Sequence, residues 1–212
     1  MLAINILYIV VNMNDKNEKG LVIVVGGPGS SGSSTIAKML AEHFNLERVY
    51  AGGIFREFVK DLGYESLDDF YSKETKEKFF ELDRKVDDFL IERAKTGNVL
   101  IESKVFGALS SKENIHCTVK IWLDSSLYVR VKRLAGKQEN LKGLRKIWFY
   151  IVNSFNLTRR RMKDGQRYKE LYGVEYGKQG LYNDIVLDSS KLNAKETFDL
   201  ILEKIKDGGY IK

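Results

Sequence analysis

The most constraining feature of the chain is a short segment in which an apolar run leads directly into a glycine-rich turn. The run, 21–25, reads Leu-Val-Ile-Val-Val, and the turn, 26–32, reads Gly-Gly-Pro-Gly-Ser-Ser-Gly. β-Branched residues bounded by glycine are typical of a buried strand. Apolar residues at helical spacing after the turn predict a helix over 34–44. The sequence therefore predicts a strand, a tight loop and a helix N-terminus in direct succession.

Such a succession forms a site for phosphate groups, because the first N–H groups of a helix lack partners and its dipole favours an anion. Gly27 and Gly32 have the spacing of the P-loop motif G-x-x-x-x-G-K-[ST], in which Ser34 takes the position of the hydroxyl that ligates magnesium. The lysine position holds Ser33. A glycine-rich turn without a ligand is the alternative, and the flanking strand and helix favour the phosphate-binding loop.

Composition limits the class of protein. The chain has 212 residues, of which 43% are hydrophobic and 30% charged, and this fits one soluble domain with a sizeable core. A net charge of +6 suits a protein that handles nucleotides or other polyanions. The single cysteine, Cys117, excludes an internal disulfide and agrees with a reducing, cytoplasmic location. The apolar residues 1–11 are too few to span a bilayer, so we expect no membrane association.

Strand-like and helix-like segments alternate, which predicts an α/β fold with a parallel five-stranded sheet between helices. The expected strands are 21–25, 47–50, 98–102, 118–123 and 184–187. After the helix at 34–44, one helix is expected to start near Ile54 and another after Ser66. A further helix ends at 96–97 and has an apolar stripe of Phe79, Leu82, Val86, Phe89 and Leu90. The C-terminal helix is expected over 194–206. We interpret 21–212 as one domain and 1–20 as a dispensable extension, with Met13 as a candidate translation start.

A long basic segment, 127–172, contains no strand pattern. Aromatic residues interleave with its lysines and arginines, among them Trp148 and Phe155. One interpretation is a helical pair with solvated basic faces and an aromatic core stripe. We favour a mobile helical lid, at about 134–166, that closes arginines onto phosphate groups.

The loop sequence resembles that of a known family. Residues 27–35 read G-P-G-S-S-G-S-S-T. This is similar to G-P-P-G-S-G-T-T-T of the archaeal-type cytidylate kinases, nucleoside monophosphate kinases of the P-loop NTPase superfamily that also lack the lysine. The resemblance implies that ATP binds at Gly27, Pro28, Gly29, Ser30, Ser31, Gly32, Ser33, Ser34 and Thr35.

Further motifs extend the resemblance to nearly everything after residue 20. Residues 50–57 resemble S-A-G-D-I-F-R-E, 99–104 resemble V-V-L-E-G-R, 166–174 resemble K-R-Y-K-E-I-Y-G-I, and 184–191 resemble D-L-V-I-N-T-S-K. The first two matches imply that Arg56 and Lys104 hold the acceptor nucleotide. Glu102 stands where a strand-end acid would orient hydrated Mg²⁺ together with Ser34, and a salt bridge or a helix cap is its alternative role. Gly53 replaces the family's aspartate, and Lys104 replaces an arginine.

The resemblance implies phosphoryl transfer from Mg²⁺-bound ATP to a nucleoside monophosphate, CMP or dCMP in this family. Because the loop lacks lysine, positive charge at the transferred group must come from elsewhere, and we expect it from the catalytic candidates Arg133, Arg160 and Arg167, with Arg130 as a fourth. Residues 136–163 depart from the family, whose acidic character is replaced here by Arg159-Arg160-Arg161.

Three other functions remain open from the residues. The chain could be another small P-loop kinase with adenylate, shikimate or dephospho-coenzyme A as its acceptor, or a nucleotide-binding protein without catalysis. The segment 145–150 interleaves aromatic and basic residues, which also suits a nucleic-acid binder. We do not expect nucleic-acid binding, because Trp148, Phe149 and Ile151 fit a helical core better. We expect a monomer whose partners are small nucleotides.

Overall fold

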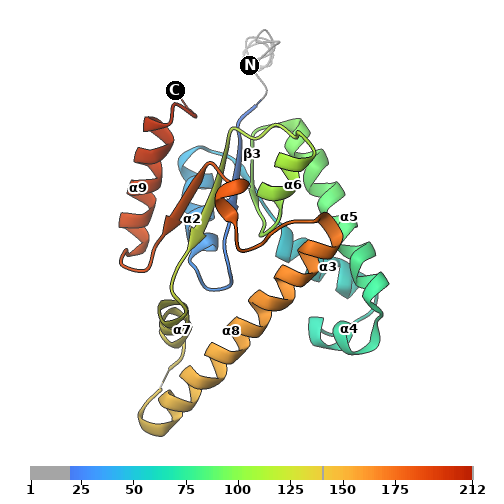
Figure 1. The fold of residues 1–212 in the computed structure, drawn as a ribbon, viewed down its shortest axis with the longest axis vertical. Helices are drawn as coiled ribbons and strands as arrows, with labels where there is room; N and C mark the ends of the chain where they lie inside the picture. Colours follow the sequence, from blue (N-terminus) through green and yellow to red (C-terminus); the bar gives the residue numbers. More distant parts are fainter. Residues whose placement is uncertain (1–19, 140, 212) are drawn as a thin grey trace, which may run out of the picture.

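A computed structural model describes residues 20–139 and 141–211 (Figure 1). The strands are β1 (Val22–Gly26), β2 (Glu47–Tyr50), β3 (Val99–Glu102), β4 (Val119–Asp124) and β5 (Ile185–Asp188). The helices are α2 (Ser33–His43), α3 (Ala51–Asp61), α4 (Leu67–Lys73), α5 (Lys76–Thr96), α6 (Phe106–Lys112), α7 (Leu127–Ala135), α8 (Gly143–Tyr172) and α9 (Ala194–Asp207), with a 3₁₀ turn at Gln179–Leu181. The predicted extension lies outside the described residues, apart from Gly20.

The five strands form one parallel sheet in the order β2-β3-β1-β4-β5. The predicted α/β fold with a five-stranded parallel sheet is confirmed, and each strand lies within a residue of its expected bounds. Val25 of β1 pairs with Glu102 of β3, and Glu102 pairs with Tyr50 of β2 on its other side. The carboxyl ends of β1, β2 and β3 therefore meet at the same level of the sheet.

Side chains alternate between the two faces of the sheet, and each face has its own apolar core. Ile23 and Val25 of β1 pack in a cluster with buried residues of α2 and α9. Val22 and Val24 point to the other face, where α5 and α6 cover them. Figure 1 shows the same arrangement, with α2 and α9 on one side of the sheet and α5 and α6 on the other. The central strand is thus buried on both faces, as parallel strands are.

Three local predictions differ from the structure. Helix α3 begins at Ala51 rather than near Ile54, so that the two glycines lie in its first turn. Phe89, expected in the apolar stripe of α5, is 43% exposed. Helix α6 was not expected, because its residues Phe106 to Ser110 are all buried and show no amphipathic period.

The segment between β4 and the 3₁₀ turn contains no strand, as expected, and consists mainly of α7 and α8. Helix α8 is 30 residues long. In Figure 1 its N-terminal half and α7 project together away from the sheet. The expected aromatic core is wrong for Trp148 and Ile151, which are 67% and 57% exposed because α7 packs against a different face of α8. Among the described residues, no helix is both long and apolar enough to cross a membrane.

Candidate functional site

The glycine-rich loop lies between β1 and α2, where the sequence predicted it. Gly32 precedes the helix with φ 98°, and Ser30 has φ 66°. These positive φ values turn the chain sharply before α2. Inside the loop the Ser31 N–H donates to the Pro28 carbonyl at 3.0 Å.

Several amides of this loop have no protein acceptor. Within the described part of the chain, the N–H groups of Gly29, Ser30, Gly32 and Ser34 donate no hydrogen bond to protein atoms. Gly29, Ser30 and Gly32 are half-buried, and backbone donors in such positions normally find a partner. A chain of such amides at a helix N-terminus is an anion site, and its partial positive charge suits the phosphates of a nucleotide.

The predicted metal pair is brought together at the end of β3. The Ser34 hydroxyl donates to Oε1 of Glu102, and the Glu102 side chain is almost fully buried. Arg48 of β2 donates to the other oxygen, Oε2, through Nε at 2.9 Å and also through Nη2. Arg48 and Glu102 lie on the neighbouring strands β2 and β3, and Ser34 reaches Glu102 from the first turn of α2. Both roles considered for Glu102 therefore have a partner here: the salt bridge with Arg48 and the pairing with Ser34.

The donor set at Ser34 and Glu102 fits Mg²⁺. A hydroxyl and a carboxylate are hard oxygen ligands, and Mg²⁺ in kinases takes only one or two protein ligands beside water and phosphate oxygens. No group of three or more His, Cys, Asp or Glu side chains within residues 20–139 and 141–211 is arranged to hold a metal by itself. A metal at this place would therefore depend on the phosphates of the nucleotide.

Two arginines of α7 donate hydrogen bonds to carbonyl groups of the glycine-rich loop. Arg130 is buried and donates from Nε to the Gly29 carbonyl at 2.8 Å. Arg133 donates to the Ser31 carbonyl, to Ser125 Oγ at 3.2 Å and to the Ser189 carbonyl at 2.9 Å. Arg133 thus ties the loop to the ends of β4 and β5. Its predicted catalytic role stays a prediction, and these contacts favour positioning of the loop.

A hollow of about 430 Å³ lies beside Arg130. It lies between the end of β4, the start of α7 and α8, and Arg130, Arg161 and Asp124 are among its lining residues. Arg161 and Asp124 form an ion pair of 3.3 Å there. A hollow beyond the carboxyl ends of parallel strands is where ligands bind in open α/β sheets.

The remaining predicted cations divide into two kinds. Arg56 and Arg160 are exposed, and neither forms an ion pair with any residue that the structure describes. Arg56 lies over the Tyr50 ring at 5.2 Å. Lys104 and Arg167, in contrast, both bind the carboxylate of Asp164 on α8. Among the described residues, two of the four cations thus have no ion-pair partner, and two are paired with a carboxylate.

Arg167 lies in a buried ionic cluster between α5 and α8. Its Nη2 is 3.3 Å from Asp164 Oδ1 and donates to the Tyr168 hydroxyl at 3.0 Å, and its Nε is 3.3 Å from Asp83 Oδ2. The guanidinium also lies over the Phe79 ring at 5.8 Å. These contacts fix the direction of the side chain, which faces the part of the fold built by α4 and α5.

Burial shifts the pKa values of the two α5 carboxylates in this cluster. Burial raises the pKa of Asp83 to about 6, against the attraction of Arg167. Burial raises the pKa of Asp87 to about 7, although the hydrogen bond from Tyr172 lowers it. Burial also lowers the pKa of Lys104, while Asp164 acts in the opposite direction. The charge state of the cluster therefore changes near neutral pH.

Asp87→Asn is expected to stabilise the protein at high pH. A carboxyl with a raised pKa in the folded state binds its proton more tightly than in the unfolded chain, so its contribution to stability is lost as pH rises from about 4 to about 7. The asparagine oxygen still accepts from Tyr172 and carries no charge. We expect a gain in Tm of at least roughly 2–4 °C at pH 8, which shrinks toward pH 4. Thermal unfolding across this range measures it, with the exposed Asp88→Asn as control; a gain independent of pH contradicts the burial argument.

Sequence reasoning found the loop, Ser34 and Glu102, which the fold brings together. It placed Arg56, Lys104, Arg160 and Arg167 in the chain but not relative to one another. Arg48 was not predicted, because nothing in the short strand at 47–50 distinguishes this arginine from an exposed one. Sequence reasoning also missed Asp83 and Asp87, although acids beside Leu82 and Val86 on the apolar face of α5 are a usable signal.

Comparisons with known proteins agree with this geometry. A family model described as an AAA domain matches residues 25–143. The cytidylate kinase of Pyrococcus horikoshii is 35% identical over 196 residues, which cover 89% of this chain and 93% of the relative. The cytidylate kinase of Methanocaldococcus jannaschii is 33% identical over 185 residues, covering 87% and 97%.

Solved structures resemble the fold. The shikimate kinase from Aquifex aeolicus aligns with a TM-score of 0.53 at 20% identity, covering 89% of this chain and 98% of that structure. The shikimate kinase from Acinetobacter baumannii, solved in complex with shikimate, aligns with the same TM-score at 16% identity, covering 91% and 96%. At such identities the likeness concerns the arrangement of sheet and helices alone.

Proposed function

Because the chain belongs to the cytidylate kinase family of P-loop kinases, we propose that it transfers the γ-phosphoryl group of ATP to CMP or dCMP. The observation that supports this proposal best is the arrangement of the loop 27–32. Its amides without protein acceptors lie next to the Ser34–Glu102 pair at the carboxyl end of the sheet. An amide cradle beside hard oxygen ligands suits a nucleoside triphosphate and its metal.

In this mechanism the loop amides bind the β- and γ-phosphates of ATP. Bound Mg²⁺ would supply a positive charge that offsets the charge on these phosphates, and Ser34 and Glu102 are the residues that would hold it. Arg130 and Arg133 keep the loop in shape from behind. The hollow beside Arg130 is our candidate for the nucleoside of the donor.

Our candidates for the acceptor side are cations that do not line this hollow. We assign Arg56 and Lys104 to the acceptor phosphate, and Arg160 and Arg167 to the charge that develops on the transferred group. A monophosphate oxygen is already an anionic nucleophile, so no general base is required. Residues 134–166, which form the end of α7 and much of α8, act as the lid that excludes water when both nucleotides are bound.

A panel of acceptors with ATP tests the function. ADP release is measured with CMP, dCMP, UMP, AMP, shikimate and dephospho-coenzyme A. We expect CMP or dCMP to give the highest kcat/KM by at least tenfold. Faster turnover with another acceptor would show that this acceptor is the substrate. ATP binding with no acceptor-dependent ADP release would indicate a nucleotide-binding protein without catalysis.

Ser34→Ala is expected to weaken ATP binding only in the presence of magnesium. The hydroxyl is the proposed metal ligand, while the Ser34 amide remains available to phosphate. We expect a loss of roughly tenfold in affinity, about 1.4 kcal/mol, with Mg²⁺ and no change in EDTA. Calorimetric titration under both conditions measures it. Equal affinity of the wild type with and without Mg²⁺ contradicts the assignment.

A further inference from the structure

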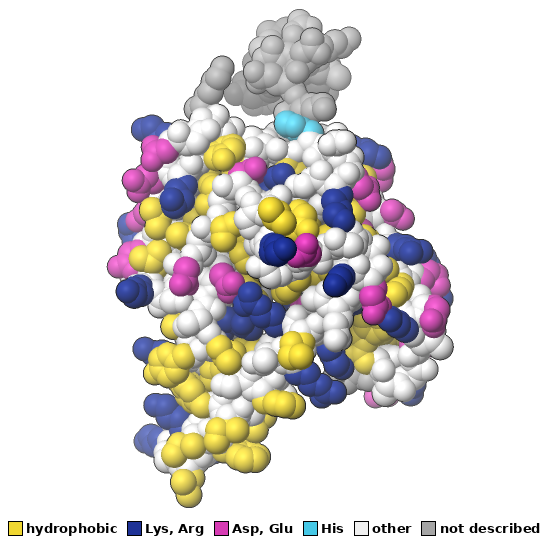
Figure 2. All heavy atoms as spheres, in the orientation of Figure 1, with side chains coloured by type: hydrophobic (Ala, Val, Ile, Leu, Met, Phe, Trp, Pro, Cys, Tyr) yellow, Lys and Arg dark blue, Asp and Glu magenta, His cyan; other side chains and the backbone are white. Residues whose placement is uncertain are grey.

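The exposed face of α8 is a row of large apolar side chains. We call the row the α8 seam; it consists of Leu144 (83% exposed), Trp148 (67%), Ile151 (57%), Phe155 (66%) and Met162 (62%). Successive members are separated by four, three, four and seven residues, which is the a/d spacing of a heptad repeat with Thr158 at the remaining position. Figure 2 shows hydrophobic side chains gathered on the projecting end of the molecule. Apolar exposure on this scale marks an interaction surface.

The seam is not the face of α8 that the fold or the proposed site uses. At about 100° per residue, its members fall within roughly 60° of one another around the helix. The buried residues Leu157, Asp164 and Tyr168 centre roughly 140° away in one direction. Arg160 and Arg167 lie roughly 140–160° away in the other direction. A lid that presents these arginines to phosphate groups therefore leaves the seam outside.

One border of the seam is cationic, and the opposite border carries Ile147, which is 58% exposed. Arg145, Arg159 and Lys163 flank it on one side, roughly 60–100° around the helix from its centre. From residue 143 to 163 α8 has no Asp or Glu. Figure 2 shows basic side chains next to the apolar ones on this part of the surface. A partner that packs on the seam meets only positive charge at its edge, so acidic residues there are favourable.

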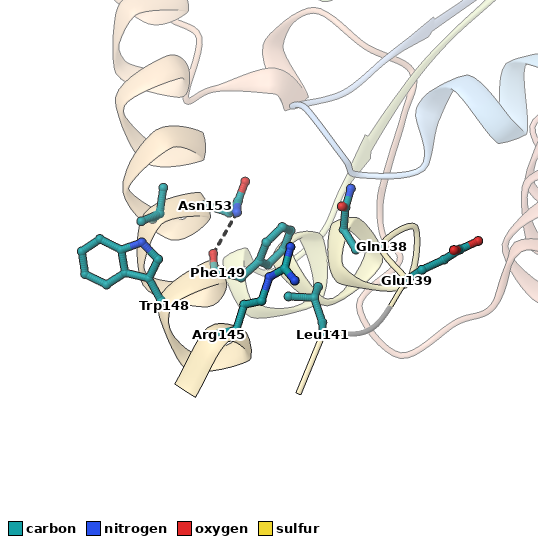
Figure 3. A pocket seen from close by; sticks show the side chains of 8 residues that line it. Gln138, Glu139, Leu141, Arg145, Trp148, Phe149 and Asn153 are labelled. Atoms are coloured by element: carbon teal, nitrogen blue, oxygen red, sulfur yellow. Dashed lines mark hydrogen bonds between the residues drawn. The ribbon is translucent and has the colours of Figure 1, made fainter. Parts of the chain in front are cut away.

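A hollow of about 200 Å³ continues the surface at the tip of the α7–α8 hairpin. Trp148 and Arg145 line it from α8, and Gln138 and Leu141 line it from the connection after α7. In Figure 3 the Phe149 ring lies between these two sides and Trp148 stands at the outer edge. Trp148 thus belongs both to the seam and to the hollow, which has room for one apolar side chain.

We propose that the α8 seam binds an amphipathic helix of another protein, one whose apolar stripe is flanked by Asp or Glu. Heptad spacing is the pattern that packs one helix against another, and the hollow at the tip receives an anchoring side chain. A second copy of this chain fits worse, because its own α8 brings cations and no carboxylate to the border. A membrane surface would also meet the basic border, and the heptad spacing together with a hollow that takes one side chain favours a helix.

The test uses a synthetic helical peptide with leucine at a and d and glutamate at e and g, and its isomer with lysine at e and g. We expect the glutamate peptide to bind the full-length protein with Kd below roughly 10 µM, to change the fluorescence of Trp148, and to bind at least tenfold more tightly than the lysine peptide. Phe155→Asp, with thermal unfolding to verify that it is folded, is expected to weaken binding at least tenfold. Leu181→Asp, at a residue that is 65% exposed elsewhere on the surface, is the matched control and is expected to bind normally.

Several results would overturn the proposal. Equal binding of the two peptides would remove the charge argument, and normal binding by a folded Phe155→Asp protein would remove the seam. A dimer in sedimentation that Phe155→Asp abolishes would make a second copy the occupant. Binding to vesicles of phosphatidylcholine and phosphatidylglycerol that Phe155→Asp abolishes would make it a membrane.

Discussion

Arg167→Ala is expected to lower kcat by roughly 10³-fold or more, with little change in the affinity for ATP. The guanidinium is oriented by Asp83, Asp164 and the Tyr168 hydroxyl, and its contacts are with α5 and α8 rather than with the glycine-rich loop. An arginine that stabilises charge only in the transition state contributes to kcat and not to ground-state binding. Steady-state kinetics with saturating CMP and calorimetric titration of ATP measure the two quantities separately.

The same substitution also removes a cation from a buried cluster. Asp83 and Asp164 would lose a partner, and breaking a buried ion pair in this way costs roughly 3–5 kcal/mol of stability. Thermal unfolding must therefore accompany the kinetics, and the assays are done well below the Tm of the variant. Arg167→Lys keeps the charge without the fork of donors and is expected to recover stability but little of kcat. Lys169→Ala, at an exposed neighbour, is the control; an unchanged kcat in Arg167→Ala would remove this residue from the mechanism.

Gly27→Ala is expected to weaken ATP binding at least roughly 100-fold, about 2.7 kcal/mol. A Cβ atom at Gly27 would lie 2.5 Å from the carbonyl oxygen of Leu123, and this neighbour is backbone at the end of β4 that cannot move aside cheaply. The loop must shift instead, and the amides that we assign to phosphate shift with it. Calorimetric titration with ATP and Mg²⁺ measures the loss.

Gly29→Ala is the matched control for this substitution. A Cβ atom there would meet only Leu157 Cδ2, at 3.6 Å, an ordinary contact distance. The amide of residue 29 is retained in the alanine variant, so ATP affinity is expected to stay within a few-fold of the wild type. Equal losses in both variants would mean that the loop tolerates no side chain for reasons other than this clash. Normal affinity in Gly27→Ala would contradict the position of the phosphate site.

The parts of the site that depend on local sequence were predictable. The strand, loop and helix from residue 21 to 44 follow from neighbours along the chain, and Glu102 joins them because the ends of parallel strands share one edge of the sheet. Contacts between distant elements were not predictable in this way. Arg48 reaches Glu102 only through the pairing of β2 with β3, and Asp164 meets Lys104 only through the path of α8.

The exposure of α8 shows the same limit. Trp148 and Ile151 have the composition of a helix core, and sequence alone does not tell how many neighbours a helix will have. In the structure α7 covers one face of α8, and the seam stays uncovered. The chemistry of an apolar residue predicts that it is buried. It is buried only where another element of the chain packs against it.

In the proposed function, the main-chain amides of residues 27–35 bind the terminal phosphates of ATP without a lysine. Amide chemical shifts of the ¹⁵N-labelled wild-type protein, titrated with a non-hydrolysable ATP analogue and Mg²⁺, test it most directly. We expect saturable binding with the largest shifts at Gly29, Ser30, Gly32 and Ser34. Saturable binding that leaves these four amides unmoved, or no binding of any nucleoside triphosphate, would contradict it.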